Sequence, residues 1–411
     1  MSRHLQHAMA ALRQKSREAG QALILAVLCL TAVLGFVGLS IDVGVLRNSR
    51  ILLQTAADSA AIAGAAEVKY NDVTTAAQND AMKNGLMLGP DAAEGTLVVN
   101  NPPLGGPHAA DSSYVEVIAS RRVPTGFMSL FGINSVTIKA RAVAGLGSGA
   151  GCIFALDPTA GSAILINGNG NVTAQCGVVD NSSSTQALLV NGGVNFSATS
   201  IGVVGGYTKN GSVTVSPTPV TGLPPDSDPL AFLTKPSVGS CNYNNYVVNG
   251  SGTYTLNPGV YCNGLLINGN ATVTFNPGTY ILNNGAFTMN GSSRISGTGV
   301  TFFLTGNASF TLNGGSALTL IAPTTGTYAG ILIFQDPADT STGTINGNNS
   351  STIQGAVYMP KAPLTINGTG TAAAYTILVV DKVTFNGNSS FNDNYTTLPN
   401  GSPIKAAHLT E

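Results

Sequence analysis

The longest apolar segment of the chain lies near its beginning, from Ala22 to Leu39, and no charged residue interrupts it. A helix over this segment, continued to Ile41, is about 30 Å long at a rise of about 1.5 Å per residue. That length matches the hydrocarbon core of a bilayer. We therefore predict a single transmembrane helix over residues 21–41.

The residues before this segment predict its orientation. In residues 1–20 the basic side chains outnumber the single acid, Glu18. Because positive charge is retained on the cytoplasmic side, we expect a basic cytoplasmic tail over residues 1–20 in the inner (cytoplasmic) membrane. Everything after Asp42 is then periplasmic or extracellular. A cleaved secretory signal is the alternative, although its apolar region is typically only about 7 to 15 residues long. Both interpretations export the rest of the chain.

Beyond the apolar segment the pattern stays helical, but its regularly spaced positions carry small residues. Residues at every fourth position lie on one face of a helix, and small side chains there let another backbone approach closely. This helix-packing face suits either an assembly partner or later strands of the same chain. It consists of Ala56, Ala60 and Gly64, with Ala57, Ala61 and Ala65 one residue later.

Alternating apolar and polar positions begin near residue 95. Thr96–Val99, Tyr114–Ala119 and Ser135–Ala144 are rich in β-branched residues and predict short strands. We therefore expect residues 42–147 to form an exported helix followed by a small, strand-containing α+β segment of pilin-like outline.

Residues 148–395 repeat a short motif in which an apolar residue is followed by Asn-Gly. Most repeats are about 20 residues apart and enclose short alternating runs, as in a solenoid whose successive turns stack. Asn257-Pro258-Gly259 and Asn276-Pro277-Gly278 supply matching tight turns. We predict an all-β, single-stranded right-handed parallel β-helix in which Asn side chains can form ladders between coils; antiparallel hairpins with Asn-Gly turns are the alternative. The motif asparagines are Asn167, Asn191, Asn249, Asn268, Asn290, Asn313, Asn346, Asn367 and Asn386.

Two segments depart from the repeat. Residues 212–240 are rich in proline, which cannot donate a ladder hydrogen bond, so we predict a loop that leaves the solenoid. Residues 396–411 lack the motif and are expected to form a C-terminal tail.

Four cysteines lie in the exported region, and an even number there is typical of disulfides. Cys152 and Cys176 are 24 residues apart and Cys241 and Cys262 are 21 apart, which is about one coil in each case. We predict these two pairs, since each would join adjacent coils.

Charge is scarce, because only 9% of residues are charged and the formal net charge is −1. This balance provides no basic field for nucleic acid, and we expect no nucleic-acid partner. A helical bundle with a salt-bridged surface is excluded for the same reason. Outward Ser, Thr and Asn side chains of the solenoid offer a polar surface for glycans, a filament or a second copy.

Catalytic candidates are few. Residues 152–395 contain neither Glu nor His, which excludes Ser-His-Asp chemistry there. Asp336 and Asp339 with Lys361 or Lys382 form the best acidic cluster if coils align them, but an Asp beside a proline more commonly caps a turn. We therefore predict a protein that is not an enzyme and has no cofactor. A membrane-tethered, polysaccharide-cleaving β-helix enzyme is the alternative.

Several motifs resemble a known family. Gly20-Gln21, Asp42-Val43-Gly44 and the run from Gln54 to Ala65 are similar to the N-terminal module of TadE/TadG-like Flp (tight adherence) pilus-assembly proteins. Weaker similarity continues through Phe127–Gly132 and Ala140–Gly145. The resemblance implies a cell-envelope protein with pilus-assembly partners or a like subunit, and no enzymatic role.

Some members of this family also carry a metal-binding von Willebrand factor type A domain, whose metal loop has the form Asp-x-Ser-x-Ser. Asp180-Asn181-Ser182-Ser183-Ser184 matches that string. A strand, however, is predicted after it where that domain has a helix, so we expect no metal site.

Overall fold

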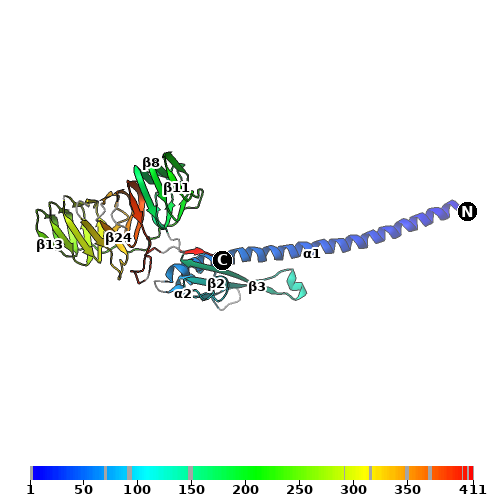
Figure 1. Cartoon of the computed structure of the whole chain (residues 1–411). Coiled ribbons are helices and arrows are strands. Elements are labelled where there is room, and N and C mark those ends of the chain that lie inside the picture. The colour runs from blue at the N-terminus through cyan, green and yellow to red at the C-terminus, as the bar shows by residue number, and fades with distance from the viewer. Residues whose placement is uncertain are drawn as a thin grey trace. The chain divides into compact units, whose positions relative to one another are not determined.

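The computed structural model of the chain describes residues 3–68, 72–89, 95–146, 151–290, 292–313, 317–347, 351–368, 373–399, 401–404 and 407–410. It divides into two compact units: the first contains Met1–Leu146 with Ala407–Glu411, and the second contains Gly147–Ala406. Figure 1 shows the elements of both units.

One helix, α1 (Arg3–Glu67), contains the predicted apolar segment and continues far beyond it. From Leu25 onward it is long and apolar enough to cross a membrane, and almost none of its most apolar part is buried in the protein. Phe36, for example, is 72% exposed. The chain therefore has the membrane-spanning-capable helix that the hydrophobic pattern predicts.

The rest of the first unit is a small sheet and a second helix. Strands β1 (Gly95–Asn100), β2 (Tyr114–Pro124) and β3 (Ser135–Leu146) are antiparallel neighbours, and β27 (Ala407–Leu409) pairs with the outer edge of β3. Helix α2 (Val73–Lys83) begins at Asp72, whose side chain accepts a hydrogen bond from the Thr75 N–H. The expected C-terminal tail thus includes a strand. The sequence did not predict this strand because three residues are too few to show an alternating pattern.

The second unit is a parallel β-solenoid of about ten turns. Its strands pair in parallel with the coil above and below, so the hairpin alternative is excluded for the described residues. Inward Val, Ile, Leu, Phe and Tyr side chains fill the interior as one continuous core.

About ten coils form the stack. In stacking order the coils contain β12 (Tyr243–Val248) and β13 (Thr253–Leu256); β14 (Gly259–Ile267) and β15 (Thr272–Phe275); β16 (Gly278–Asn283), β17 (Phe287–Met289) and β18 (Arg294–Thr298); β19 (Val300–Thr305), β20 (Phe310–Asn313) and β21 (Ala317–Ile321); β22 (Ile331–Gln335) and β23 (Gly343–Asn346); β24 (Thr352–Asn367); β25 (Thr376–Asn386) and β26 (Ser389–Phe391); β4 (Gly151–Ala155), β5 (Ile164–Asn167) and β6 (Asn169–Ala174); β7 (Gly177–Asp180) and β8 (Leu188–Ser197); and β9 (Ser200–Val203), β10 (Tyr207–Gly211) and β11 (Thr214–Ser216).

Stacking order and sequence order differ in this solenoid. The first strand, β4, pairs with the late strand β25, so the chain enters in the middle of the stack and proceeds to β11 at one end. It resumes at β12, at the opposite end, and its later coils fill the space back to β25. Figure 1 places β11 and β13 at opposite ends, with the orange and red strands between them.

The proline-rich segment makes this crossing. Successive contacts pin it to coil after coil: Asn181 Nδ2 donates to the Asp226 carbonyl (2.7 Å), and Tyr358 Oη donates to Asp228 Oδ2 (2.7 Å). Further along, Lys235 Nζ lies 3.0 Å from Asp336 Oδ1. Instead of a loop that leaves the solenoid, residues 217–242 are a strap that runs along it. Proline suits this role because a strap does not need ladder donors.

A side-chain ladder explains most of the Asn-Gly repeats. Asn386 Nδ2 donates to Asn367 Oδ1 (2.7 Å), and Asn191 Nδ2 donates to Asn167 Oδ1 (2.9 Å). Asn386 and Asn167 are themselves register partners, so the row continues across the junction of late and early coils. Glycine follows because the coils come close there: at Gly192, where φ is +98°, a Cβ would lie 2.2 Å from the Gly168 carbonyl oxygen. The row contains Asn290, Asn313, Asn346, Asn367, Asn386, Asn167, Asn191 and Asn210.

Candidate functional site

Asp42 is the first acidic residue after the predicted membrane span, and it ties α1 to the connection between β2 and β3. Its Oδ1 accepts a hydrogen bond from the Gly126 N–H (2.8 Å), and its Oδ2 accepts one from the Met128 N–H (2.7 Å). The hydrogen bond from Met128 contributes most, and together with the one from Gly126 it holds the pKa of the Asp42 carboxyl below its usual value. Met128 begins the 3-10 helix η1 (Met128–Phe131). A carboxylate at this point of α1 therefore fixes the tip of the β2–β3 hairpin.

Gly38 lies one helical turn before Asp42 and gives the same hairpin room to approach. A Cβ on Gly38 would lie 2.5 Å from the Phe127 ring, and one on Gly35 would lie 3.7 Å from it. The ring thus rests against the bare backbone of α1. This contact places the hairpin tip beside the last part of the predicted span.

The small-residue face of α1 is covered by the protein's own sheet. Ala57, Ala60, Ala61 and Ala65 are fully buried, Ala56 is nearly so, and all belong to one cluster with apolar residues of β2 and β3. Gly64 completes the face, since a Cβ there would lie 3.2 Å from Val115 Cγ1. Of the two uses left open by the sequence, packing against later strands is the one found.

An ion pair between the buried Glu116 and the half-buried Arg141 supports the sheet, and no sequence pattern pointed to it. Arg141 Nε donates to Glu116 Oε1 (2.6 Å), and Asn100 Nδ2 donates to Glu116 Oε2 (2.8 Å). Burial alone would raise the pKa of Glu116, but the hydrogen bonds from Arg141 and Asn100 outweigh it and the pKa is lowered. Arg141 carries a second link, since Gln54 of α1 donates to its carbonyl oxygen (3.0 Å).

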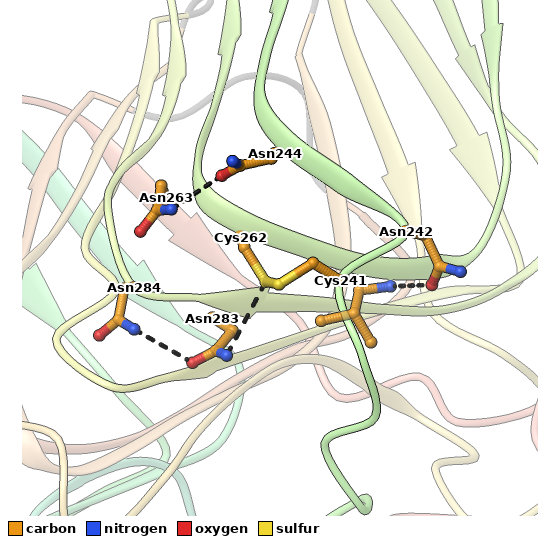
Figure 2. The surroundings of a disulfide bond; sticks show 8 residues. Cys241, Asn242, Asn244, Cys262, Asn263, Asn283 and Asn284 are labelled. Carbon is orange, nitrogen blue, oxygen red and sulfur yellow. Dashed lines mark hydrogen bonds between the residues drawn. A yellow bond between two sulfur atoms is a disulfide. The ribbon is translucent and has the colours of Figure 1, made fainter.

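Both predicted disulfides are present, Cys152–Cys176 and Cys241–Cys262, each with a Cα–Cα distance of 5.7 Å. Each joins two adjacent coils. Figure 2 shows the second pair, where Cys241 ends the strap and Cys262 lies in β14. Asn263 Nδ2 beside it donates to Asn244 Oδ1 (2.7 Å), which adds a second link between the same two coils.

The acidic cluster expected from the sequence does not include Lys382, and its two acids have other partners. Asp336 accepts hydrogen bonds from the Ala338 N–H (3.0 Å) and from Lys235 of the strap. Asp339 accepts from the Ser341 and Ala308 N–H groups (2.9 and 2.8 Å). Both therefore cap turns. Lys382 lies elsewhere, 3.7 Å from both Asp157 and Asp381.

A different acidic group forms where the early and late coils meet. Asp381 lies in β25, directly after the residues that pair with β4. The Asp157 N–H donates to the Asp381 carbonyl (3.0 Å). Asp180 lies one coil further and is almost completely buried. Burial raises its pKa to about 6, with the negative charge of Asp157 adding to the effect. Its Oδ1 accepts from the Ser182 N–H (3.0 Å), whereas its Oδ2 is buried without a hydrogen-bond partner.

The metal-loop string at Asp180 is used for turns. Ser182 Oγ donates to the Ala160 carbonyl (2.6 Å), and Ser183 Oγ donates to the Pro158 carbonyl (3.0 Å). The strand β8 follows, as the alternation predicts. Among the described residues, no three His, Cys, Asp or Glu side chains lie close enough to share a metal ion.

A cavity of about 560 Å³ lies next to this string, between β7, β9 and the first part of the strap. Its wall is mostly apolar, with Val179, Ile201 and Leu223 among its residues, and Asp180 and Asp226 also border it. Burial raises the pKa of Asp226 as well. This pocket of the solenoid is thus bordered by two carboxyl groups with raised pKa values.

The Asp180→Asn variant is expected to stabilise the solenoid at neutral pH. Because the folded pKa of Asp180 is about 6 and its usual value is 3.8, the folded protein retains a proton that the unfolded chain releases between those pH values. The free energy of unfolding therefore falls as pH rises from about 4 to 6 and is constant above. Removing the charge should restore about 3 kcal/mol at pH 7 and almost nothing at pH 3.5, measured by urea unfolding at both pH values.

Asp157→Asn is the comparison, because the pKa of Asp157 is shifted in the opposite direction. Hydrogen bonds from the Thr159 and Ala160 N–H groups and the charge of Lys382 outweigh burial and lower the pKa of Asp157. Its replacement should destabilise the protein at pH 7. A loss of stability in Asp180→Asn at pH 7 would contradict the buried charge as the source of the effect.

The N-terminal part of the chain matches a known family. The sequence model described as "Putative Flp pilus-assembly TadE/G-like" matches residues 20–67, which end where α1 ends. This confirms the resemblance drawn from Gly20-Gln21, Asp42 and the small-residue face. A comparison with characterised proteins found no match, and a comparison with solved structures found none.

Proposed function

We propose that the chain is a single-pass, membrane-anchored cell-envelope protein of the pilus-assembly type, with a cytoplasmic N-terminus and an exported solenoid. The observation that carries the proposal is the position of the family match. Residues 20–67 form one continuous helix whose first part is apolar and exposed, and whose second part is the packing face of a folded unit. In this proposal, the anchor and the first exported domain share one continuous helix.

The solenoid acts, in this proposal, as a structural, adhesive or partner-binding module without enzymatic activity or a cofactor. Its Asp336 and Asp339 are engaged in turns. Asn side chains form rows along its coils, and outward Ser and Thr side chains add a polar surface. Such a surface suits pilus-assembly subunits, a second copy or glycans.

Cysteine labelling tests the orientation. In a Cys29→Ser background, a Leu104→Cys variant should react with a membrane-impermeant maleimide in intact spheroplasts, because Leu104 is 79% exposed in the first exported unit. A Ser16→Cys variant should react only after lysis, since it lies in the basic tail. The reverse pattern, or equal labelling of both, would contradict the proposal.

Photocrosslinking tests the partner. A photoreactive residue at Val247, which is 50% exposed in the end coil, should crosslink to pilus-assembly proteins, to another copy or to glycans. A photoreactive residue at Leu104 reports on the first unit and is the comparison. The absence of any specific crosslink from Val247 would oppose a binding role for the solenoid end.

The cavity beside Asp180 favours one second candidate, a membrane-tethered polysaccharide-cleaving enzyme. A carboxyl group whose pKa is about 6 can act as a general acid near neutral pH. Sugar release from polysaccharides by the purified chain, abolished in Asp180→Asn, would support this candidate. Release that persists unchanged in Asp180→Asn, or no release at all, would oppose it.

A further inference from the structure

The tip of the β2–β3 hairpin, residues 125–134, exposes large apolar side chains. Leu130 is 76% exposed, Phe131 is 73% exposed and Ile133 is 44% exposed. The ten residues of this hairpin tip include no charged residue. An apolar cluster left on a surface in this way marks a site that contacts a membrane or another molecule.

The hairpin tip lies at the level of the membrane span of α1. Phe127 packs against Gly38 and Gly35, which both belong to the predicted span over residues 21–41. At about 1.5 Å per residue, Gly38 is about 6 Å deeper along the helix than Asp42. Because Asp42 also holds the Gly126 and Met128 N–H groups, the hairpin tip is fixed at this depth.

Most of the backbone donors of the hairpin tip are satisfied within the protein. Leu130 N–H donates to the Phe127 carbonyl (3.1 Å), Gly132 N–H to the Ser129 carbonyl (3.0 Å) and Ile133 N–H to the Met128 carbonyl (3.2 Å). The Thr125 hydroxyl donates to the Ile133 carbonyl. Because unpaired backbone polar groups are costly next to lipid, this internal pairing suits a tip at the boundary of the membrane.

Basic residues flank the hairpin tip along β2, β3 and α1. Arg121 and Arg122 on β2 and Lys139 on β3 are exposed a few residues from the tip, and Arg47 and Arg50 are exposed on α1 beyond Asp42. Long basic side chains at this position relative to an apolar tip reach phosphate groups of anionic lipids.

We propose that this hairpin tip is a second membrane contact: Leu130, Phe131 and Ile133 insert into the boundary between head groups and acyl chains of the leaflet from which α1 emerges. Arg121, Arg122 and Lys139 then bind anionic phospholipid head groups. The inference rests on the proposed anchoring of α1. The contact fixes the tilt and rotation of the first unit on the membrane, which a single helix alone does not.

Tryptophan fluorescence provides the test, because the chain contains no Trp. The full-length Phe131→Trp variant, reconstituted in vesicles of phosphatidylcholine and phosphatidylglycerol, should show blue-shifted emission and strong quenching by lipids with a nitroxide near the head group. Leu104→Trp is the matched control, since Leu104 is 79% exposed in the loop between β1 and β2. We expect quenching of Phe131→Trp to exceed that of the control at least about twofold.

Two further variants separate the possible outcomes. Phe36→Trp reports on the anchor: quenching of Phe36→Trp without quenching of Phe131→Trp would overturn the second contact alone, and quenching of neither would overturn the anchor as well. Leu130→Trp repeats the measurement if Phe131→Trp fails to fold. A blue shift without lipid quenching would mean that protein covers the hairpin tip, which also overturns the proposal.

Charge dependence tests the lipid class. Phe131→Trp combined with Arg121→Gln and Arg122→Gln should lose the difference between vesicles with and without phosphatidylglycerol. If the quenching is independent of phosphatidylglycerol before the arginines are replaced, the basic residues do not bind anionic lipid.

Discussion

Ala60→Leu is expected to destabilise the first unit by about 3 kcal/mol, because its side chain points into a face with no free volume. Ala60 is fully buried, and the residues before and after it on the same face are buried alanines and Gly64. Three added carbons would push α1 away from β2 and β3. Hydrogen exchange read by mass spectrometry should show faster exchange of β2 and β3, with the solenoid strands unaffected.

Thr55→Leu is the matched control, since Thr55 is on the exposed side of the same helix. The same leucine side chain on the exposed side should leave exchange in β2 and β3 unchanged. Unchanged exchange in Ala60→Leu would mean that the face is free to bind an assembly partner. If exchange does increase, any loss of crosslinks in this variant reports an unfolded sheet and cannot be assigned to a broken interface.

The sequence predicted the parts of this protein that depend on local pattern. The apolar run predicted the membrane-capable helix, and the Asn-Gly period predicted stacked parallel coils. Both succeed because each residue's environment is determined within about one turn of helix or one coil of solenoid. The disulfides follow for the same reason, since one coil separates the members of each pair.

The sequence could not predict the order in which the coils stack. Most coils share the alternating pattern and an Asn at the same position, so these patterns do not specify that β4 pairs with β25. The acidic group illustrates the consequence. Pairing of consecutive coils suggested Asp336 and Asp339 with Lys361 or Lys382, whereas Lys382 lies beside Asp157, more than two hundred residues earlier in the chain.

The sequence also could not predict the position and exposure of the hairpin tip. Phe127–Gly132 resembles the family in sequence, but no sequence pattern indicates that its side chains are exposed. What distinguishes it is the pair of contacts with Asp42 and Gly38, and both partners are more than eighty residues away. Nothing in the sequence around Gly38 and Asp42 indicates which distant residues they contact.

Replacing Cys241 and Cys262 together by alanine is expected to cost about 3 kcal/mol, from the loop entropy of a disulfide that closes about 20 residues. The loss should be concentrated in β12 and β13, because these strands form the end coil and pair with only one neighbouring coil. The same disulfide anchors the strap where it reaches that end. Hydrogen exchange should therefore accelerate in β12, β13 and the last residues of the strap.

The double replacement of Cys152 and Cys176 by alanine provides the comparison. That pair joins coils inside the stack, where β4 pairs with β25 on one side and with β7 on the other. Losing either disulfide should cost a similar loop entropy, since the sequence separations are 24 and 21 residues. Around Cys152–Cys176, however, neighbouring coils on both sides should keep the strands protected from hydrogen exchange. If β12 and β13 remain protected without Cys241–Cys262, the end coil is held by its core packing and asparagine contacts alone, and the disulfide is not what closes that end of the solenoid.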